Sequence, residues 1–62
     1  MCETNAFLRS DGSEEMLLES LSRIEVKGDS LHLFNIFGDR KELKGRILEI
    51  NFQGGKVFIE RL

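Results

Sequence analysis

The stretch RILEINFQGGKVFIERL (residues 46–62) carries the clearest fold signal in this chain. Apolar and polar residues alternate in its first half, which places Leu48, Ile50 and Phe52 on one face of a predicted strand. The glycine turn at residues 53–55 interrupts the pattern, and KVFIERL follows as a second strand. Because two such strands around a glycine turn are typical of a β-hairpin, this stretch favours an antiparallel β fold.

The segment LHLFNIF (residues 31–37) is also rich in strand-forming residues, and it is apolar on both faces. One face carries Leu31, Leu33 and Phe37, and the other carries Phe34 and Ile36. A strand that is apolar on both faces must be covered on both, by a barrel that closes over it or by another subunit.

Glycine turns recur along the whole chain, at residues 11–12, 27–29, 37–39 and 44–46. Their close spacing predicts successive hairpins in an all-β barrel or sandwich, and we expect one small domain over residues 1–62. The segment SEEMLLESLSRI is ambiguous, because its leucines also have helical spacing. The hairpin rhythm favours EMLLE and SRIEVK as two strands over a helical turn within residues 14–24.

A chain of 62 residues makes one domain at most and buries only about 60% of its unfolded surface. With one cysteine it has no internal disulfide, which leaves tight packing, a metal or an oligomer as the source of extra stability. The net charge of −2 implies neither nucleic-acid nor membrane binding by itself. Residues 1–30 carry three basic and seven acidic side chains (net −4), and residues 31–62 carry six and four (net +2).

No apolar run approaches the roughly 18 residues that span a bilayer, and the amino terminus lacks the order of a signal peptide. We therefore expect a cytoplasmic protein with a reduced thiol.

Cys2 is the residue that poses a chemical question, because it lies beside the terminal amine if Met1 is removed. Amine and thiol have reference pKa values of roughly 7.7–8 and 8.5, so both can lose protons to a metal near neutral pH. Nitrogen and thiolate donors in a planar set suit Ni(II) or Cu(II). Glu3 offers the nearest further donors. From composition alone, a terminal residue of no consequence is the simpler interpretation of Cys2.

The remaining titratable residues give no catalytic pattern. His32 is the only histidine, and a structural role is its simplest interpretation, with metal ligation as the alternative. The sequence shows no nucleophile with a histidine at a known spacing and no phosphate-binding glycine loop, so we expect a protein that is not an enzyme.

A basic segment, GDRKELKGR, offers an alternative function. It brings together Arg40, Lys41, Lys44 and Arg46 in what we expect to be a loop at residues 40–46. Small β-barrels bind RNA through basic loops beside aromatic side chains. The phenylalanines of the predicted strands are more simply core residues, and Asp39 and Glu42 dilute the basic charge.

The opening MCETNAFL, the acidic DGSEEMLLE and the block LFNIFGDRKELKGRI together resemble the CooT family of small nickel-binding proteins. The resemblance implies an SH3-like small β-barrel that forms a homodimer and binds Ni(II) through the cysteine after the initiator methionine, here Cys2. It implies a metallochaperone or nickel sensor, with a nickel enzyme such as carbon monoxide dehydrogenase, or its maturation machinery, as partner. Relatives are also described as predicted RNA-binding proteins, so RNA is the alternative partner.

Overall fold

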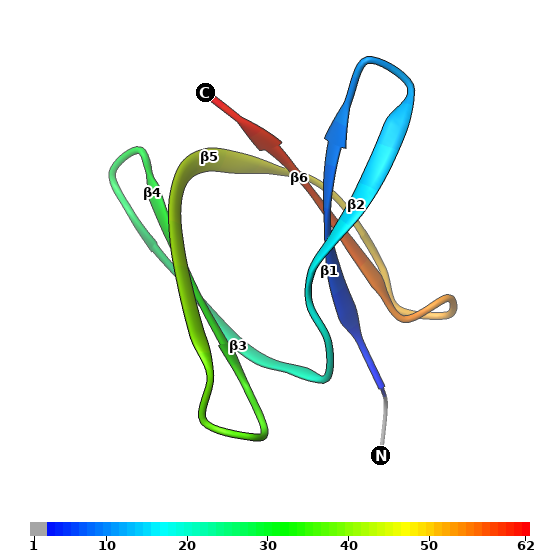
Figure 1. Cartoon of the computed structure of the whole chain (residues 1–62), viewed down its shortest axis with the longest axis vertical. Coiled ribbons are helices and arrows are strands. Elements are labelled where there is room, and N and C mark those ends of the chain that lie inside the picture. The colour runs from blue at the N-terminus through cyan, green and yellow to red at the C-terminus, as the bar shows by residue number, and fades with distance from the viewer. Residues whose placement is uncertain (1–2) are drawn as a thin grey trace.

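The computed structural model describes residues 3–62, which form six β-strands in one sheet. The strands are β1 (Asn5–Ser10), β2 (Ser13–Leu18), β3 (Leu21–Lys27), β4 (Ser30–Asn35), β5 (Arg40–Asn51) and β6 (Lys56–Arg61) (Figure 1). The all-β prediction is confirmed, and the ambiguous segment forms the two strands β2 and β3 rather than a helix. Within the described chain, no helix is long and apolar enough to cross a membrane.

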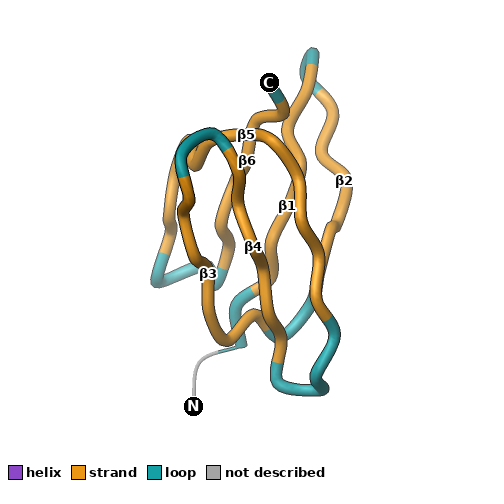
Figure 2. The backbone as a smooth tube through the Cα atoms, turned by 90° about the vertical axis from the view of Figure 1, so that its left-hand side faces the viewer, coloured by secondary structure: helices purple, strands orange, loops and turns teal. Residues whose placement is uncertain are grey.

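The sheet has the strand order β2-β1-β6-β5-β4-β3 and is not closed. Five neighbouring pairs are hydrogen-bonded, and four of them are antiparallel; β1 and β6 pair in parallel. Figures 1 and 2 show the sheet curling back on itself, so that its end strands β2 and β3 join through a short connection at one end. No pairing joins β2 to β3 within residues 3–62, so the expected closed barrel is not observed.

Strand β5 is shared by the two halves of the sheet. Residues 40–44 pair with β4, and residues 45–51 pair with β6. Gly45 lies at the changeover and is buried, and a Cβ atom there would collide with the backbone carbonyl of Glu60. Glycine at position 45 therefore lets β6 approach the bend of β5.

The core lies on the concave side of the curled sheet. Its buried members come from three strands, β1, β4 and β6, and are Ala6, Leu31, Leu33, Val57 and Ile59. Partly buried apolar residues from all the strands except β4 and β6 pack against them, namely Leu8, Leu17, Leu18, Leu21, Ile24, Leu43 and Ile47. Every strand thus contributes to a single apolar cluster, as a two-layered small domain requires.

The apolar face predicted for Leu48, Ile50 and Phe52 is largely exposed, with Ile50 at 46% and Phe52 at 82%. The pairing of β5 with β6 is irregular between Ile47 and Glu49, and Ile47 is the residue that packs against the core. A bulge inserts an extra residue, so the two-residue alternation assumed from sequence does not hold along this strand. Phe52 also lies beyond the end of β5.

The predicted strand at residues 31–37 ends early, at Asn35. Leu31 and Leu33 are buried as expected, but Ile36 and Phe37 lie in the following turn and are 60% and 67% exposed. The Asn35 side chain explains the break, because its Oδ1 accepts hydrogen bonds from the N–H groups of Phe37 (3.1 Å) and Asp39 (2.8 Å). An asparagine that bonds its own backbone two and four residues on favours a turn over a continued strand.

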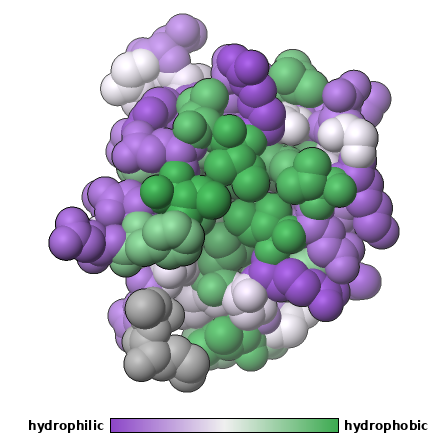
Figure 3. Space-filling model, turned by 180° about the vertical axis from the view of Figure 1, so that it is seen from behind, coloured by the Kyte–Doolittle hydropathy of each residue, from purple (hydrophilic) through white to green (hydrophobic). Residues whose placement is uncertain are grey.

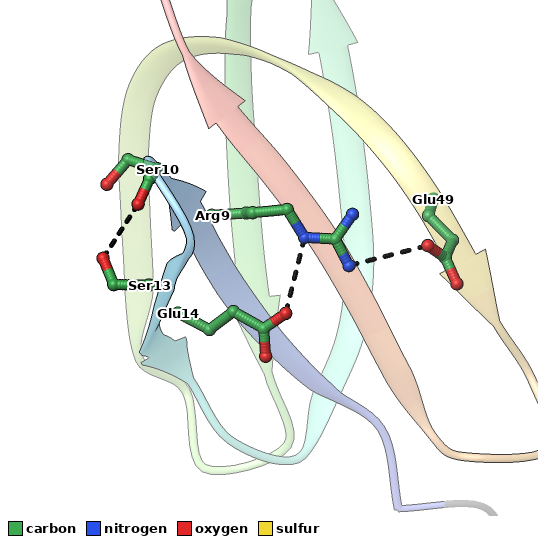
Figure 4. Close-up of polar contacts among 5 residues, drawn as sticks. All are labelled: Arg9, Ser10, Ser13, Glu14 and Glu49. Carbon is green, nitrogen blue, oxygen red and sulfur yellow. Dashed lines mark hydrogen bonds and ion pairs between the residues drawn. The ribbon is translucent and has the colours of Figure 1, made fainter.

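The β1–β2 hairpin turns at Asp11 and Gly12, whose φ angles of 47° and 81° are both positive. Such a two-residue turn suits the twist of an antiparallel hairpin, and Asp-Gly is a preferred pair for it. Beside the turn, the Arg9 guanidinium lies between Glu14 (3.4 Å) and Glu49 (3.6 Å) (Figure 4). It also lies 4.0 Å above the ring of Phe58, so one side chain bridges four strands.

Gly45→Ala should lower the free energy of unfolding by about 1–3 kcal/mol, because the new methyl group forces β6 away from the bend. Gly54→Ala is the matched control, since a Cβ atom there meets only the side chain of Asn51. Urea unfolding of both variants measures the difference. Equal losses at the two positions would contradict the role given to Gly45.

Asn35→Ala should cost about 1–3 kcal/mol, because it leaves two backbone N–H groups of a tight turn without their acceptor. Asn51→Ala removes a single side-chain bond, to the N–H of Gly54, at an exposed position and should cost less. Thermal unfolding of the two variants measures how much stability each substitution removes. A smaller loss at Asn35 than at Asn51 would show that the turn does not depend on its asparagine.

Candidate metal site at the amino-terminal end

The amino-terminal segment, residues 3–5, is held against two other parts of the sheet. The N–H of Asn5 donates to the carbonyl of Gly55 (2.8 Å), in the turn before β6. The carbonyl of Thr4 accepts from the N–H of Leu21 (2.6 Å), the first residue of β3. The segment therefore crosses the end of the molecule where the β2–β3 connection lies (Figure 1).

Gly55 permits this close approach. It is buried and has a φ of +67°, and a Cβ atom at this position would collide with the carbonyl oxygen of Glu3. Glycine adopts positive φ without steric cost and leaves room for a neighbouring backbone. The sequence predicted Gly55 as a hairpin turn residue. In the structure, its missing side chain also leaves room for the backbone of the amino-terminal segment.

The side chain of Asn5 extends the network to a strained residue. Its Oδ1 accepts the N–H of Ser20 (3.0 Å), and the carbonyl of Ser20 accepts the N–H of Ile36 (3.0 Å). Ser20 has a φ of +55°, a left-handed conformation that is uncommon outside glycine. Such a conformation persists only where its surroundings fix it, and here the bonds on both sides of Ser20 do so.

Of the two predicted metal ligands, Cys2 and Glu3, the structure describes only Glu3. Cys2 lies outside the described residues. Glu3 is exposed at the amino-terminal end of the sheet. Within residues 3–62, no group of three or more His, Cys, Asp or Glu side chains is arranged to hold a metal ion. The described side chains alone therefore do not make up a metal site, and Glu3 is the one predicted ligand that the structure places.

His32 lies in the middle of β4, on the face opposite Leu31 and Leu33. Its register partners are Glu25 on β3 and Glu42 on β5, and its Nε2 lies 3.7 Å from Oε2 of Glu42. The side chain is 27% exposed and forms an ion pair with Glu42 when the imidazole carries a second proton. This position in the sheet agrees with the structural role expected from sequence.

The four basic residues proposed for RNA lie in strand β5, so the expected loop at residues 40–46 is wrong. Lys41 pairs with Leu33, whereas its neighbour Arg40 pairs with Phe34 on the other face of the sheet. Lys44 shares the face of Arg40, with Glu42 between them. The structure therefore brings together only part of the predicted set on one face, because successive strand residues point to opposite sides.

Acidic partners further divide the basic residues. Nε of Arg46 lies 2.8 Å from Oε1 of Glu60 on β6. On β3, Glu25 pairs with Arg23 (3.3 Å) and with Lys27 (3.8 Å). Charges of both signs thus alternate over this face of the sheet, which weakens its attraction for a phosphate backbone.

A shallow apolar hollow lies elsewhere on the surface and was not anticipated from sequence. It has a volume of about 370 Å³, and its lining residues are Val26, Gly28, Asp29, Leu31, Gly45, Arg46, Ile47 and Leu62. Val26 and Leu62 are more than half exposed. Figure 3 shows that apolar side chains gather on one face of the molecule, as is typical of surfaces that another chain covers.

Known proteins match this chain along almost its whole length. An uncharacterized protein of Methanocaldococcus jannaschii is 35% identical over 60 residues, covering 97% of this chain and 98% of the relative. An uncharacterized protein of Methanothermobacter thermautotrophicus is 32% identical and covers 97% and 89%. A crystal structure described as CooT from Carboxydothermus hydrogenoformans superposes with a TM-score of 0.92 at 33% identity, covering 98% of each chain.

The family model for the CO dehydrogenase accessory protein CooT matches residues 1–60, a range that includes both Cys2 and the anchored segment after it. The fold of the structural neighbour agrees with that match over nearly every residue. This chain therefore belongs to the CooT family.

Proposed function

We propose that this chain, folded as one domain over residues 1–62, binds Ni(II) through Cys2 in a homodimer. In this proposal it acts in the cytoplasm as a metallochaperone or nickel sensor and is not an enzyme. The observation that carries the proposal is the family match over residues 1–60. Carbon monoxide dehydrogenase is a nickel enzyme. In this proposal its accessory protein delivers nickel to the enzyme or acts together with the machinery that matures it.

The chemistry of the amino terminus supports nickel as the cargo. Once Met1 is removed, the amine and thiolate of Cys2 offer one nitrogen and one sulfur donor that close a five-membered chelate ring. The backbone amide and carboxylate of Glu3 are the next donors along the chain. Such a set also suits Cu(II), which binds more tightly in the usual affinity order, so selectivity then depends on which metal the cell supplies.

The anchoring of residues 3–5 adds a structural reason. A ligand at a free chain end loses much conformational entropy on binding, and the bonds of Thr4 and Asn5 to the sheet reduce that loss for Glu3, whose carbonyl lies against Gly55.

The apolar hollow supports a second copy of this chain as the homodimer partner. Its apolar lining includes the exposed Val26 and Leu62, and it carries one acidic residue, Asp29, and one basic residue, Arg46. In a twofold interface the same patch meets itself, so a patch that holds both signs can pair its charges across the axis.

RNA binding through Arg40, Lys41, Lys44 and Arg46 stays a prediction. Its signature would be an affinity that falls steeply with added salt. The nickel proposal does not involve these residues, and the two functions are therefore separable by mutation.

Cys2→Ala should abolish the thiolate-to-nickel charge-transfer band that a Ni(II) titration of tag-free protein develops, without changing the unfolding midpoint. Intact mass recorded beforehand shows whether Met1 is absent. Arg40→Glu combined with Lys41→Glu is the matched control and should leave the band and its saturation ratio unchanged. A protein that has lost Met1 and shows no band, or a band that survives Cys2→Ala, would exclude Cys2 as the ligand.

Val26→Glu should convert the homodimer to monomer and raise its dissociation constant by tenfold or more, on the order expected for a carboxylate buried in an interface. Met16→Glu is the control, because Met16 is exposed to a similar degree on β2 and does not line the hollow. Sedimentation equilibrium or native mass spectrometry measures both. Dimers of equal stability in the two variants would place the interface elsewhere.

A further inference from the structure

The apolar hollow beside the bend of β5 has a buried floor and an exposed rim. Its buried lining residues are Leu31, which is 1% exposed, and Gly45. Its most exposed apolar residues are Val26 and Leu62, at 62% and 67%. Exposed apolar surface that is gathered in one place in this way marks a site that another molecule covers.

Backbone hydrogen bonds hold two sides of the hollow in place. The N–H of Gly45 donates to the carbonyl of Asp29 (2.9 Å), which ties the β3–β4 turn to the bend of β5. The N–H of Leu62 donates to the carbonyl of Lys44 (3.1 Å). The surface is therefore formed before a partner binds, and a preformed surface loses little entropy when it is covered.

The uncovered apolar surface continues from the hollow along β5. Ile47 lines the hollow and pairs in register with Ile59, and Ile50 pairs with Val57. Because Ile59 and Val57 are both core residues, Ile47 and Ile50 lie on the same face of β5 despite the bulge between them. Ile50 is 46% exposed, so the apolar surface is larger than the hollow itself. A stable interface needs such an extension, since it covers about 800 Å² of each partner.

Two charges of opposite sign also line the hollow. Asp29 is exposed and forms no ion pair with another side chain of residues 3–62. Arg46 pairs with Glu60 at 2.8 Å, and its side chain is nevertheless 68% exposed. Asp29 and Arg46 thus lie at the same hollow without pairing within one copy, and each can meet an opposite charge from outside.

A second copy of this chain supplies what this surface lacks. In an isologous interface, a residue contacts a second residue of the partner, and the second residue of the first copy contacts the first residue of the partner. Asp29 and Arg46 on opposite sides of the twofold axis would therefore form two ion pairs. Two facing hollows would leave a void that close packing does not tolerate. The exposed side chains of Val26 and Leu62 are placed to fill it.

We propose that the hollow is one half of an isologous interface between two copies of this chain. Val26 and Leu62 of each copy enter the hollow of the other, and Asp29 of each copy pairs with the partner's Arg46. This inference rests on the proposed homodimer, and it adds where the two copies meet and in which orientation. It does not involve the metal site.

The test reverses the two charges one at a time. Asp29→Arg makes two arginines face each other, and Arg46→Asp makes two aspartates do so. Each variant alone should therefore have a homodimer dissociation constant raised about tenfold or more. In an equal mixture each arginine meets an aspartate, so a heterodimer should form in clear excess of the about half that random pairing gives. Native mass spectrometry separates the three dimers by mass.

Glu15→Arg and Lys41→Asp are the matched controls for charge. They make the same changes in charge at exposed positions outside the hollow and should dimerise as wild type does. Asp29→Arg keeps the backbone bond to Gly45, so it should fold. Should Arg46→Asp fail to fold because its carboxylate lies beside Glu60, Arg46→Asp combined with Glu60→Gln replaces it.

The apolar contact is tested by truncation. Leu62→Ala should raise the homodimer dissociation constant about fivefold or more, as expected for a buried interface side chain. Phe52→Ala is the control, because Phe52 is 82% exposed and does not line the hollow. An effect of Phe52→Ala equal to that of Leu62→Ala would overturn the assignment of Leu62 to the interface.

Each outcome of the charge reversal decides the proposal. Weak homodimers of both variants together with a favoured heterodimer support it. Weak homodimers without a favoured heterodimer overturn it, because the two charges then do not face each other across a twofold axis. Wild-type dimerisation of both variants, or equal losses in the two controls, also overturns it and leaves the homodimer standing on another surface. Wild-type protein that stays monomeric ends this inference and the homodimer together, whereas the nickel titration of Cys2→Ala is decided separately.

Discussion

Strand β5 pairs with β4 along its first part and with β6 along its second part, and the rest of the fold depends on this double pairing. Its first part pairs only with β4 and its second part only with β6, so each half of the sheet depends on the bend between them. A two-stranded hairpin alone is barely stable in water. The buried leucines of β4 meet Val57 and Ile59 of β6 only because β5 turns the two halves toward each other. The absence of a side chain at Gly45 makes that turn sterically possible.

The parallel pairing of the first and last strands determines where the amino-terminal segment lies. It places β1 beside β6, so that the segment before β1 lies against the turn before β6. The same segment also bonds the start of β3. The segment at residues 3–5 is thus held among three connections at this end of the sheet.

The two functional alternatives make different demands on this fold. RNA binding needs basic side chains on one surface, but strand geometry points Lys41 away from its neighbours, and glutamates lie among the others. Nickel binding needs few residues, and the family to which the chain belongs is that of a CO dehydrogenase accessory protein. The apolar hollow is the surface that the proposed homodimer would cover.

The sequence by itself determined the all-β class, four of the five expected glycine turns, the strands of the ambiguous segment and, through its motifs, the family. These features are local, because turn residues and alternation act over a few positions. The turn expected at residues 44–46 lies within β5. A turn-forming asparagine and a bulge broke the period expected for Phe37, Leu48 and Ile50. The basic segment at residues 40–46 lies in β5, although the sequence predicted a loop. Only the tertiary structure decided the parallel pairing of β1 with β6, the open edge between β2 and β3, and the network around Asn5. Those contacts join residues far apart in the chain, and their energies depend on which backbones the fold brings within hydrogen-bond distance.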